Sequence, residues 1–218
     1  RARHPRCTVY WVGLPGGQSF IGATPEQLVR VSGRRVSTMA LAGTVPAGDA
    51  AQGARLLASA KNRHEQHLVV REIIETLQGL CTHVRVPDEP RVLRLGNVCH
   101  LQSNISGRLS RERHILDLVA ALHPTPAVGG LPREKAREAI EVLEPEGRGW
   151  YAGPIGWCDA AGEGEFFVAL RGALLTKTRA HLLAGCGLVA ASDPEEEWQE
   201  TGWKMKAMGE VLAAHGRR

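Results

Sequence analysis

Asp193-Pro194-Glu195-Glu196-Glu197-Trp198-Gln199-Glu200 predicts the start of a long helix near the end of the chain. Asp193 is a typical N-cap residue, and proline is well tolerated at the first helical position because its missing N–H has no intrahelical partner there. Glu196 stands three residues after the cap, where it can complete a capping box. We therefore expect a helix that begins at Asp193.

This helix is expected to have two different faces. Glu197, Glu200 and Lys204 follow one another at spacings of three and four residues, so their charges share one side. Just before the helix, Gly185 and Gly187 allow backbone N–H groups to approach an anion. An ordinary surface helix with acidic residues in its first turn has the same charge pattern. The side of the helix opposite Glu197, Glu200 and Lys204 carries an apolar stripe, made of Trp198, Met205, Met208 and Leu212.

The composition of the whole chain is that of a globular protein. The chain has 218 residues, of which 43% are hydrophobic and 23% charged, enough to build a sizeable core. The net charge of +4 is spread along the chain without a basic block, and only two tyrosines and three phenylalanines could stack on bases. We therefore expect neither nucleic acid nor a membrane as a partner. Five scattered cysteines favour reduced thiols in the cytoplasm.

Periodicity and turn residues indicate a single α+β domain over residues 1–218. No internal repeat, low-complexity segment or linker divides the chain. Strands are expected over 8–12, 19–23, 27–31, 35–42, 91–95, 99–103, 155–159, 165–175 and 180–184. Helices are expected over 50–80, 115–122 and 133–143, besides the one that begins at Asp193. In the first of these helices, one face is expected to carry Leu56, Ala60, His67, Val70, Ile74 and Leu77, and the opposite face Lys61, Glu65 and Glu72.

Several polar residues stand where they could face a ligand. Glu26 follows Thr24-Pro25 at the edge of a strand, and Gly43-Thr44 ends a strand in a glycine corner. Glu65 lies in a polar stretch of a helix, and His100 lies in a strand-like run. Each of them could also be an ordinary turn, surface or core residue.

Arg171 is the least expected of these residues. Strand alternation would place it on the same face as Phe167 and Ala169. A sheet-facing arginine must pair with a carboxylate of the protein or of a ligand, or reach water. Carboxylates from two helices together with this arginine would suit Mg²⁺ bridging to a carboxylated substrate. Spacing alone does not show that these groups meet.

Short motifs follow one another along almost the whole chain. They are Thr24-Pro25-Glu26-Gln27-Leu28, Leu41-Ala42-Gly43-Thr44, Lys61-Asn62-Arg63-His64-Glu65, His100-Leu101, His123-Pro124-Thr125-Pro126-Ala127-Val128-Gly129-Gly130, Gly149-Trp150-Tyr151-Ala152-Gly153, Ala169-Leu170-Arg171, Gly185-Cys186-Gly187, and Ser192-Asp193-Pro194 through Glu200. In this order and spacing they resemble the chorismate-utilising enzymes. That family includes isochorismate synthases, salicylate synthases, anthranilate synthase large chains and aminodeoxychorismate synthases.

The resemblance implies a fold and a metal. The fold would be the chorismate-binding-enzyme fold, a layered α/β sandwich in which large, mostly antiparallel sheets face each other with helices outside. Glu65 and Glu200, with Glu197 nearby, would hold Mg²⁺, which in turn binds the ring carboxylate of the substrate chorismate. These roles come from the family and not from the spacing.

The resemblance also implies how the substrate is held and protonated. Glu26 would be the general acid that protonates the departing ring hydroxyl, so its pKa should be raised by burial or by neighbouring carboxylates. Thr125 and His100 would line the ring site, with His100 counted among the catalytic residues. The substrate-binding residues implied in this way are Gly43, Thr44, Thr125, Tyr151, Arg171, Gly185, Gly187 and Lys204.

Within the family, the chain looks most like an isochorismate synthase. Ala42 stands where aminodeoxychorismate synthases often carry a nucleophilic lysine. The run 123–128 is similar to the isochorismate and salicylate branch rather than to the anthranilate branch. Water would then attack the ring and give isochorismate for menaquinone or siderophore synthesis. A salicylate synthase, an anthranilate-synthase-like enzyme and a non-catalytic module that binds chorismate and Mg²⁺ are the alternatives.

One feature of the family has no counterpart in this sequence. The family's general-base lysine lies roughly fifty residues before the glutamate that matches Glu26, and position 26 leaves no room for it. The chain thus resembles the C-terminal half of a family member, and the missing N-terminal half would be its partner. Loss of a general base typically lowers a rate by about 10²–10⁴-fold. We therefore expect little or no activity from these residues alone.

Overall fold

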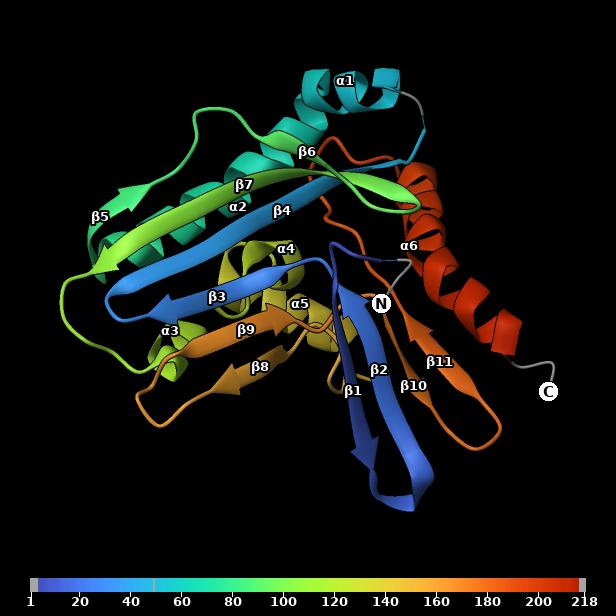
Figure 1. Ribbon diagram of the computed structural model, residues 1–218. Coiled ribbons are helices and arrows are strands. Elements are labelled where there is room, and N and C mark those ends of the chain that lie inside the picture. The colour runs from blue at the N-terminus through green and yellow to red at the C-terminus, as the bar shows by residue number, and fades with distance from the viewer. Residues whose placement is uncertain (1–3, 49, 216–218) are drawn as a thin grey trace.

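Two antiparallel sheets form the frame of the computed structural model, which describes residues 4–48 and 50–215 (Figure 1). The larger sheet has the order β5-β7-β4-β3-β9-β8, with β6 also paired to β7, and the smaller sheet has the order β1-β2-β10-β11. The strands are β1 (Thr8–Leu14), β2 (Gln18–Thr24), β3 (Gln27–Ser32), β4 (Arg35–Pro46), β5 (Cys81–Arg85), β6 (Arg91–Arg94), β7 (Val98–Leu109), β8 (Pro154–Cys158), β9 (Gly164–Val168), β10 (Gly172–Leu175) and β11 (Ala180–Leu183).

Helices cover the large sheet and connect it to the small one. Helices α2 and α3 pack on strands of the large sheet, whereas α6 contacts both β4 and β11 and so touches the two sheets. The helices are α1 (Ala50–Ala58), α2 (Ala60–Gln78), α3 (Ile115–Leu122), α4 (Pro126–Gly129), α5 (Arg133–Leu143) and α6 (Pro194–His215). None of the helices described is both long and apolar enough to cross a membrane. This combination of antiparallel sheets and helices confirms the predicted α+β class.

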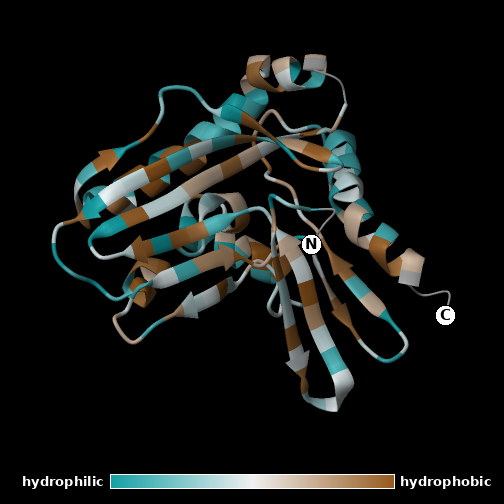
Figure 2. Ribbon diagram, viewed as in Figure 1, coloured by the Kyte–Doolittle hydropathy of each residue, from teal (hydrophilic) through white to brown (hydrophobic). Residues whose placement is uncertain are grey.

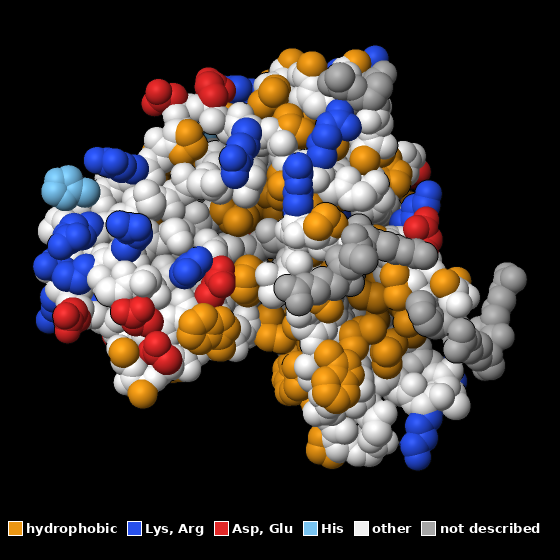
Figure 3. All heavy atoms as spheres, in the orientation of Figure 1, with side chains coloured by type: hydrophobic (Ala, Val, Ile, Leu, Met, Phe, Trp, Pro, Cys, Tyr) orange, Lys and Arg blue, Asp and Glu red, His pale blue; other side chains and the backbone are white. Residues whose placement is uncertain are grey.

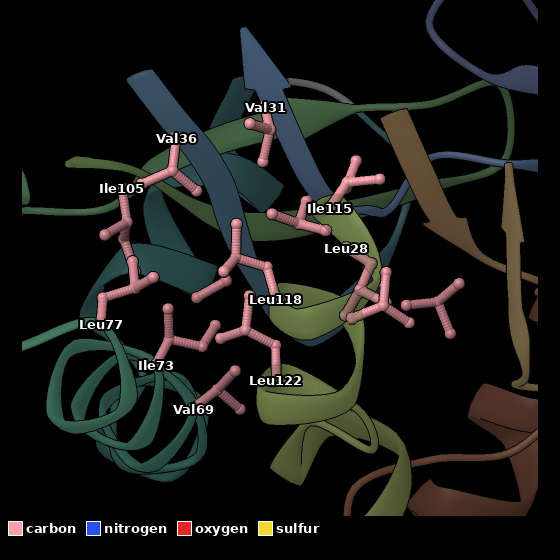
Figure 4. Packing of buried hydrophobic residues seen from close by; sticks show 14 of the residues in the cluster. Leu28, Val31, Val36, Val69, Ile73, Leu77, Ile105, Ile115, Leu118 and Leu122 are labelled. Carbon is pink, nitrogen blue, oxygen red and sulfur yellow. The ribbon is translucent and has the colours of Figure 1, made fainter. Parts of the chain in front are cut away.

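The main core lies between the large sheet and the helices α2 and α3 (Figure 4). Alternate residues of β4 turn toward this core, which is visible as alternating hydropathy at the start of the strand (Figure 2). Fully burying an aliphatic side chain of this size contributes about 1.5–3 kcal/mol. The core therefore holds the sheet and the helices in fixed positions. Leu28, Val36, Ile73, Ile105 and Leu118 are among its members with an exposed fraction of 1% or less.

The single helix predicted over 50–80 is wrong, because the chain breaks at Ser59. The backbone of Ser59 is extended, and its Oγ accepts a hydrogen bond from the N–H of Asn62 at 3.3 Å. Ser59 is thus the N-cap of a second helix. The predicted apolar face is confirmed at Leu56 and Leu77, which are fully buried, and is wrong at His67, which is exposed. Val69 and Ile73, which were not predicted, complete the buried face of α2.

The predicted strand over 165–175 is also wrong. Strand β9 ends at Val168 in the large sheet, and β10 begins at Gly172 in the small sheet. Between them Arg171 has a φ of 53°, a left-handed conformation that interrupts any strand. The apolar run of this segment therefore supplies strands to two sheets. Two short elements, β5 and α4, were not predicted from the sequence.

The start of α6 is confirmed, because Asp193 Oδ1 accepts hydrogen bonds at 3.0 Å from the N–H groups of both Glu195 and Glu196. The two faces of the helix differ in exposure. Trp198 of the apolar stripe is 72% exposed, whereas Glu197 and Glu200 are only 4% and 5% exposed. These two carboxylates pair with partly exposed lysines, as described below.

Strand β1 forms one edge of the small sheet and leaves apolar side chains in solvent. Within the described residues β1 pairs only with β2. Val9 and Trp11 are 49% and 71% exposed, and hydrophobic side chains gather over β1 and β2 in Figure 3. Strand β1 is therefore an exposed edge of the small sheet.

Tyr10 packs between two glycines of the small sheet. Its hydroxyl donates a hydrogen bond at 3.2 Å to the carbonyl of Leu170, the residue before Arg171. A Cβ atom at Gly22 or at Gly172 would overlap with the Tyr10 side chain. These glycines therefore leave the space in which Tyr10 holds the turn that carries Arg171.

We expect Gly22→Ala to destabilise the protein by about 1–3 kcal/mol, because the added methyl forces Tyr10 out of its position. For a chain of this size each kcal/mol lowers the melting temperature by about 2–4 °C, which calorimetry or thermal unfolding followed by circular dichroism would measure. Gly202→Ala on α6 is the control, since nothing lies within 4 Å of its Cβ position. Equal stability of the two variants would contradict the proposed overlap.

Candidate active site

A pocket of about 180 Å³ lies where the connection between β2 and β3, the end of β4, α2 and α6 meet. It collects predicted site residues from segments far apart in the sequence. The predicted residues that line it are Glu26, Gly43, Thr44, Glu65, His100, Tyr151, Arg171, Gly185, Gly187 and Lys204. The fold therefore brings together most of the residues that the motifs singled out.

Gly43 lies at a register shift in β4, and its backbone contacts residues on two sides of the pocket. The register between β4 and β7 shifts between Ala42 and Thr44, and Gly43 has a φ of 70°. This conformation favours glycine. The Gly43 carbonyl lies 3.2 Å from His100 Nδ1, and the Gly43 backbone also hydrogen-bonds Glu65. The glycine corner thus positions a histidine and a carboxylate.

His100 is a neutral partner of Arg171 in this pocket. Arg171 Nη2 lies 2.8 Å from His100 Nε2, and a guanidinium can only donate, so Nε2 must accept. Nδ1 then carries the proton and donates to Gly43 O and to Thr44 Oγ1, which lies 3.1 Å away. Burial, followed by the positive charge of Arg171, lowers the pKa of His100 well below its ordinary value. We therefore interpret His100 as a residue that orients Arg171.

Arg171 reaches the pocket from a turn and not from a strand face. The expectation that it shares a face with Phe167 and Ala169 is wrong, because those residues lie before the change of sheet. Burial lowers the pKa of Arg171, while Tyr151, Glu200 and Glu26 oppose this effect. The guanidinium is therefore a buried cation in contact with the pocket.

Glu26 is a buried carboxyl group between β2 and β3, with an exposed fraction of 4%. Its N–H donates to Thr24 Oγ1 at 3.2 Å. Burial raises its pKa from 4.5 to about 7, although Arg171 and Lys204 act in the opposite direction. The raised pKa expected from the sequence is confirmed, and its cause is loss of solvent rather than neighbouring carboxylates.

Two lysines and three carboxylates form an ion-pair cluster beside the pocket. Lys61 Nζ lies 2.5 Å from Glu197 Oε1 and 3.7 Å from Glu65 Oε2. Lys204 Nζ lies 2.5 Å from Glu200 Oε1 and donates to the Gly185 carbonyl at 2.8 Å. The three residues expected to hold a metal are thus already neutralised in part by lysines.

Two of the three carboxylates, Glu65 and Glu200, could hold a metal ion together. Within residues 4–48 and 50–215, no group of three or more His, Cys, Asp or Glu side chains is arranged to hold a metal ion. Mg²⁺ commonly uses one or two protein carboxylates and completes its shell with water and substrate. Burial raises the pKa of Glu65, and the negative charge of Glu200 also raises it, so these two groups are close enough to interact.

Glu197 differs from the other two carboxylates. Burial raises its pKa, but the neighbouring Lys61, Ser192 and Cys186 outweigh burial and lower it. The Lys61 ammonium, whose Nζ lies 2.5 Å from Glu197 Oε1, stabilises the ionised form. Glu197 is therefore the least available of the three for a metal.

The Gly185–Gly187 corner leaves backbone donors beside the carboxylates. The N–H groups of Gly185 and Gly187 donate to no acceptor in the described part of the chain. A Cβ atom at Gly187 would overlap with Glu65 Oε1, so only glycine allows this close approach. The corner can therefore offer N–H groups to an anion.

A comparison with known proteins decides the family. The family described as "Chorismate binding enzyme" matches residues 1–213. The chain belongs to the chorismate-binding enzyme family. The resemblance inferred from the motifs is thereby confirmed.

Relatives of this chorismate-binding enzyme include named isochorismate synthases. The salicylate biosynthesis isochorismate synthase of Pseudomonas aeruginosa is 49% identical over 92% of this chain and 43% of its own length. The isochorismate synthase MenF of Bacillus subtilis is 42% identical over 92% of this chain and 44% of its own. The chain spans about half the length of the curated relatives that it matches.

A solved structure has the same fold. MenF, the menaquinone-specific isochorismate synthase of Escherichia coli, superposes with a TM-score of 0.88 at 37% identity. The superposition covers 97% of this chain and 50% of the other. The fold of this chorismate-binding enzyme is thus that of part of the larger protein.

Thr125, Glu197 and Glu200 are the predicted site residues of this chorismate-binding enzyme that do not line the pocket. The Thr125 hydroxyl is buried at the start of α4 and has no hydrogen-bond partner among the described residues. Glu197 pairs with Lys61, and Glu200 pairs with Lys204. The contact of Thr125 with a ligand stays a prediction, because this residue lies outside the lining of the pocket.

Two cations near the pocket were missed from the sequence. Lys61 was noted only as part of a motif, and Arg148 was not singled out. Arg148 lines the pocket, pairs with Glu144 through two hydrogen bonds of 2.8 and 2.7 Å, and donates to the Val128 carbonyl at 2.6 Å. The spacing of Glu144 and Arg148 predicts an ion pair, but nothing in it indicates a pocket.

Proposed function

We propose that this chain carries the substrate-binding and acid-donating part of an isochorismate synthase. The reaction would convert chorismate to isochorismate by attack of water on the ring and loss of the neighbouring hydroxyl. The observation that supports this most is Glu26, a buried carboxyl with a pKa of about 7 that faces Arg171 and Lys204 across the pocket. An acid with this pKa can keep its proton near neutral pH and still donate it.

Two kinds of donor would bind the carboxylates of chorismate. Arg171 can form a bidentate pair with the enolpyruvyl carboxylate, helped by the hydroxyl of Tyr151. The N–H groups of the Gly185–Gly187 corner, with Lys204 beside them, suit the ring carboxylate. His100, held by Gly43 and Thr44, would fix the direction of the arginine.

Glu65 and Glu200 would hold Mg²⁺ in this proposal. A bound Mg²⁺ would neutralise the ring carboxylate and orient the substrate. Glu26 then gives its proton to the hydroxyl that leaves as water, while the attacking water must lose a proton to a base. Lys204 in the pocket and Lys61 beside it are both ion-paired, so neither lysine is a free base. We therefore propose that the base is supplied from outside these residues.

Incubation of the 218-residue chain with chorismate and Mg²⁺ tests this function, with the products separated by liquid chromatography. We expect slow formation of isochorismate, about 10²–10⁴-fold below that of an enzyme with its base, and no formation in EDTA. Salicylate with pyruvate as the first product would point to a salicylate synthase. Chorismate binding without turnover, even with added amine as a base, would favour a non-catalytic module.

The cellular setting is also part of the proposal. All five cysteines are free, which suits a reducing compartment such as the cytoplasm. Isochorismate made there would enter menaquinone or siderophore synthesis. Labelling the thiols in freshly lysed cells would test whether they are reduced.

A further inference from the structure

Lys61 pairs with two of the three carboxylates that the family resemblance assigns to the metal. Its Nζ lies 2.5 Å from Glu197 Oε1 and 3.7 Å from Glu65 Oε2. Glu65, Glu197 and Glu200 all act on Lys61 electrostatically and raise its pKa, although burial, the largest influence, lowers it. The lysine is therefore a fixed positive charge inside the carboxylate cluster.

Lys61 and Lys204 occupy different positions relative to the pocket. It stands one helical turn before Glu65 on α2, and its side chain is 21% exposed. It does not line the pocket, whereas Lys204 does. Lys204 is also tied to Gly185 by a hydrogen bond. The two lysines thus differ, since Lys204 can meet a ligand directly and Lys61 acts only through the carboxylates.

The charges of the cluster nearly balance before any ligand arrives. Three carboxylates, Glu65, Glu197 and Glu200, face two ammonium groups, Lys61 and Lys204. A Mg²⁺ ion held by Glu65 would share this carboxylate with the Lys61 ammonium, whose Nζ lies 3.7 Å from Glu65 Oε2. Like charges held by one carboxylate repel strongly in a partly buried site. The cluster alone is therefore a poor site for a dication.

We propose that Lys61 is a positioning residue that keeps Mg²⁺ binding weak until a carboxylated ligand adds negative charge to the pocket. The proposal rests on the proposed function for the identity of that ligand. The anion compensates for the repulsion between Lys61 and the dication, so metal and substrate bind in a mutually dependent way. Lys61 also holds the carboxylates in place in the metal-free protein.

Titration of the chain with MgCl₂ alone, by isothermal calorimetry, tests whether Lys61 weakens Mg²⁺ binding. We expect Lys61→Gln to bind Mg²⁺ roughly tenfold more tightly than the wild type, because a competing charge is removed. Lys61→Arg keeps the charge and should behave like the wild type. Lys206→Gln is the matched control, since Lys206 is 65% exposed and lies 4.0 Å from Glu210 on the outside of α6.

Thermal unfolding gives a second readout that needs no turnover. In EDTA, Lys61→Gln should melt at a lower temperature than the wild type, because its carboxylates repel one another. Added Mg²⁺ should raise its melting temperature more than that of the wild type. A lysine with a merely structural role would lower stability without tightening Mg²⁺ binding, so weaker or unchanged affinity in Lys61→Gln would overturn the proposal.

The dependence on the ligand is measured by repeating the Mg²⁺ titration with chorismate present. Chorismate should tighten Mg²⁺ binding in the wild type and change it much less in Lys61→Gln. An equal effect in both proteins would overturn the link between Lys61 and the substrate. Failure of the proposed function would give a different result. Chorismate would then change Mg²⁺ binding in neither protein, whereas titration with Mg²⁺ alone would still distinguish Lys61→Gln from the wild type.

Discussion

Replacing Glu26 with glutamine will lower the rate of isochorismate formation by about 10²–10⁴-fold, the usual contribution of a general acid. Glutamine has nearly the same shape but cannot give a proton to the leaving hydroxyl. The binding of chorismate and Mg²⁺ should change little, because Arg171, Glu65 and Glu200 remain. Steady-state kinetics should therefore show a loss in kcat with a similar KM.

The same substitution will make the protein more stable above neutral pH. The pKa of Glu26 rises from 4.5 to about 7 on folding, because burial disfavours its charge. Below pH 4.5 the group is protonated in both states and has no effect. Between pH 4.5 and 7 only the unfolded state loses the proton, so the folded state becomes less favourable by about 3 kcal/mol in total. Glu26→Gln avoids this cost.

Urea unfolding at pH 4.5 and at pH 8 measures this difference. Glu26→Gln and the wild type should have similar stabilities at the lower pH, and the variant should be more stable at the higher one. Glu138→Gln on α5 replaces an exposed carboxylate and serves as the control. If Glu26→Gln and the wild type lose stability equally with rising pH, the buried carboxyl is not the acid with the raised pKa.

Local sequence signals predicted the elements that depend only on neighbouring residues. The Asp193 cap with Pro194 predicted the start of α6, and the hydroxyl of Ser59 could have predicted the break before α2. The motifs found the pocket residues because family resemblance carries information about distant contacts. Element starts are therefore visible from a few residues of sequence.

Features set by contacts between distant segments could not be predicted in this way. Glu197 and Glu200 of α6 are buried because Lys61 of α2 and Lys204 pair with them, and the partner from α2 lies too far away in the sequence for local spacing to reveal it. Arg171 lies in a left-handed turn because the chain passes from one sheet to another there. In both places electrostatics or topology outweighs the local pattern, and both belong to the candidate site.

Arg171→Lys will weaken chorismate binding by roughly 10²-fold, although the positive charge is kept. Lysine is a point charge without the planar fork that pairs with a carboxylate through two parallel hydrogen bonds. It also loses the bond from Arg171 Nη2 to His100 Nε2, which fixes the direction of the guanidinium. Loss of one partner in a buried, charged hydrogen bond costs about 2–5 kcal/mol, and the retained charge places the loss near the lower end.

The expected loss is in affinity, so it should appear in KM or in the dissociation constant of chorismate more than in kcat. Arg137→Lys on α5 makes the same chemical change at a residue that is 68% exposed, and it should bind chorismate normally. Circular dichroism of Arg171→Lys should match the wild type, because the turn keeps its contact from Tyr10 to Leu170. Unchanged chorismate binding in Arg171→Lys would mean that the substrate carboxylate lies elsewhere, with the Gly185–Gly187 corner and Lys204 as the remaining donors on the pocket wall.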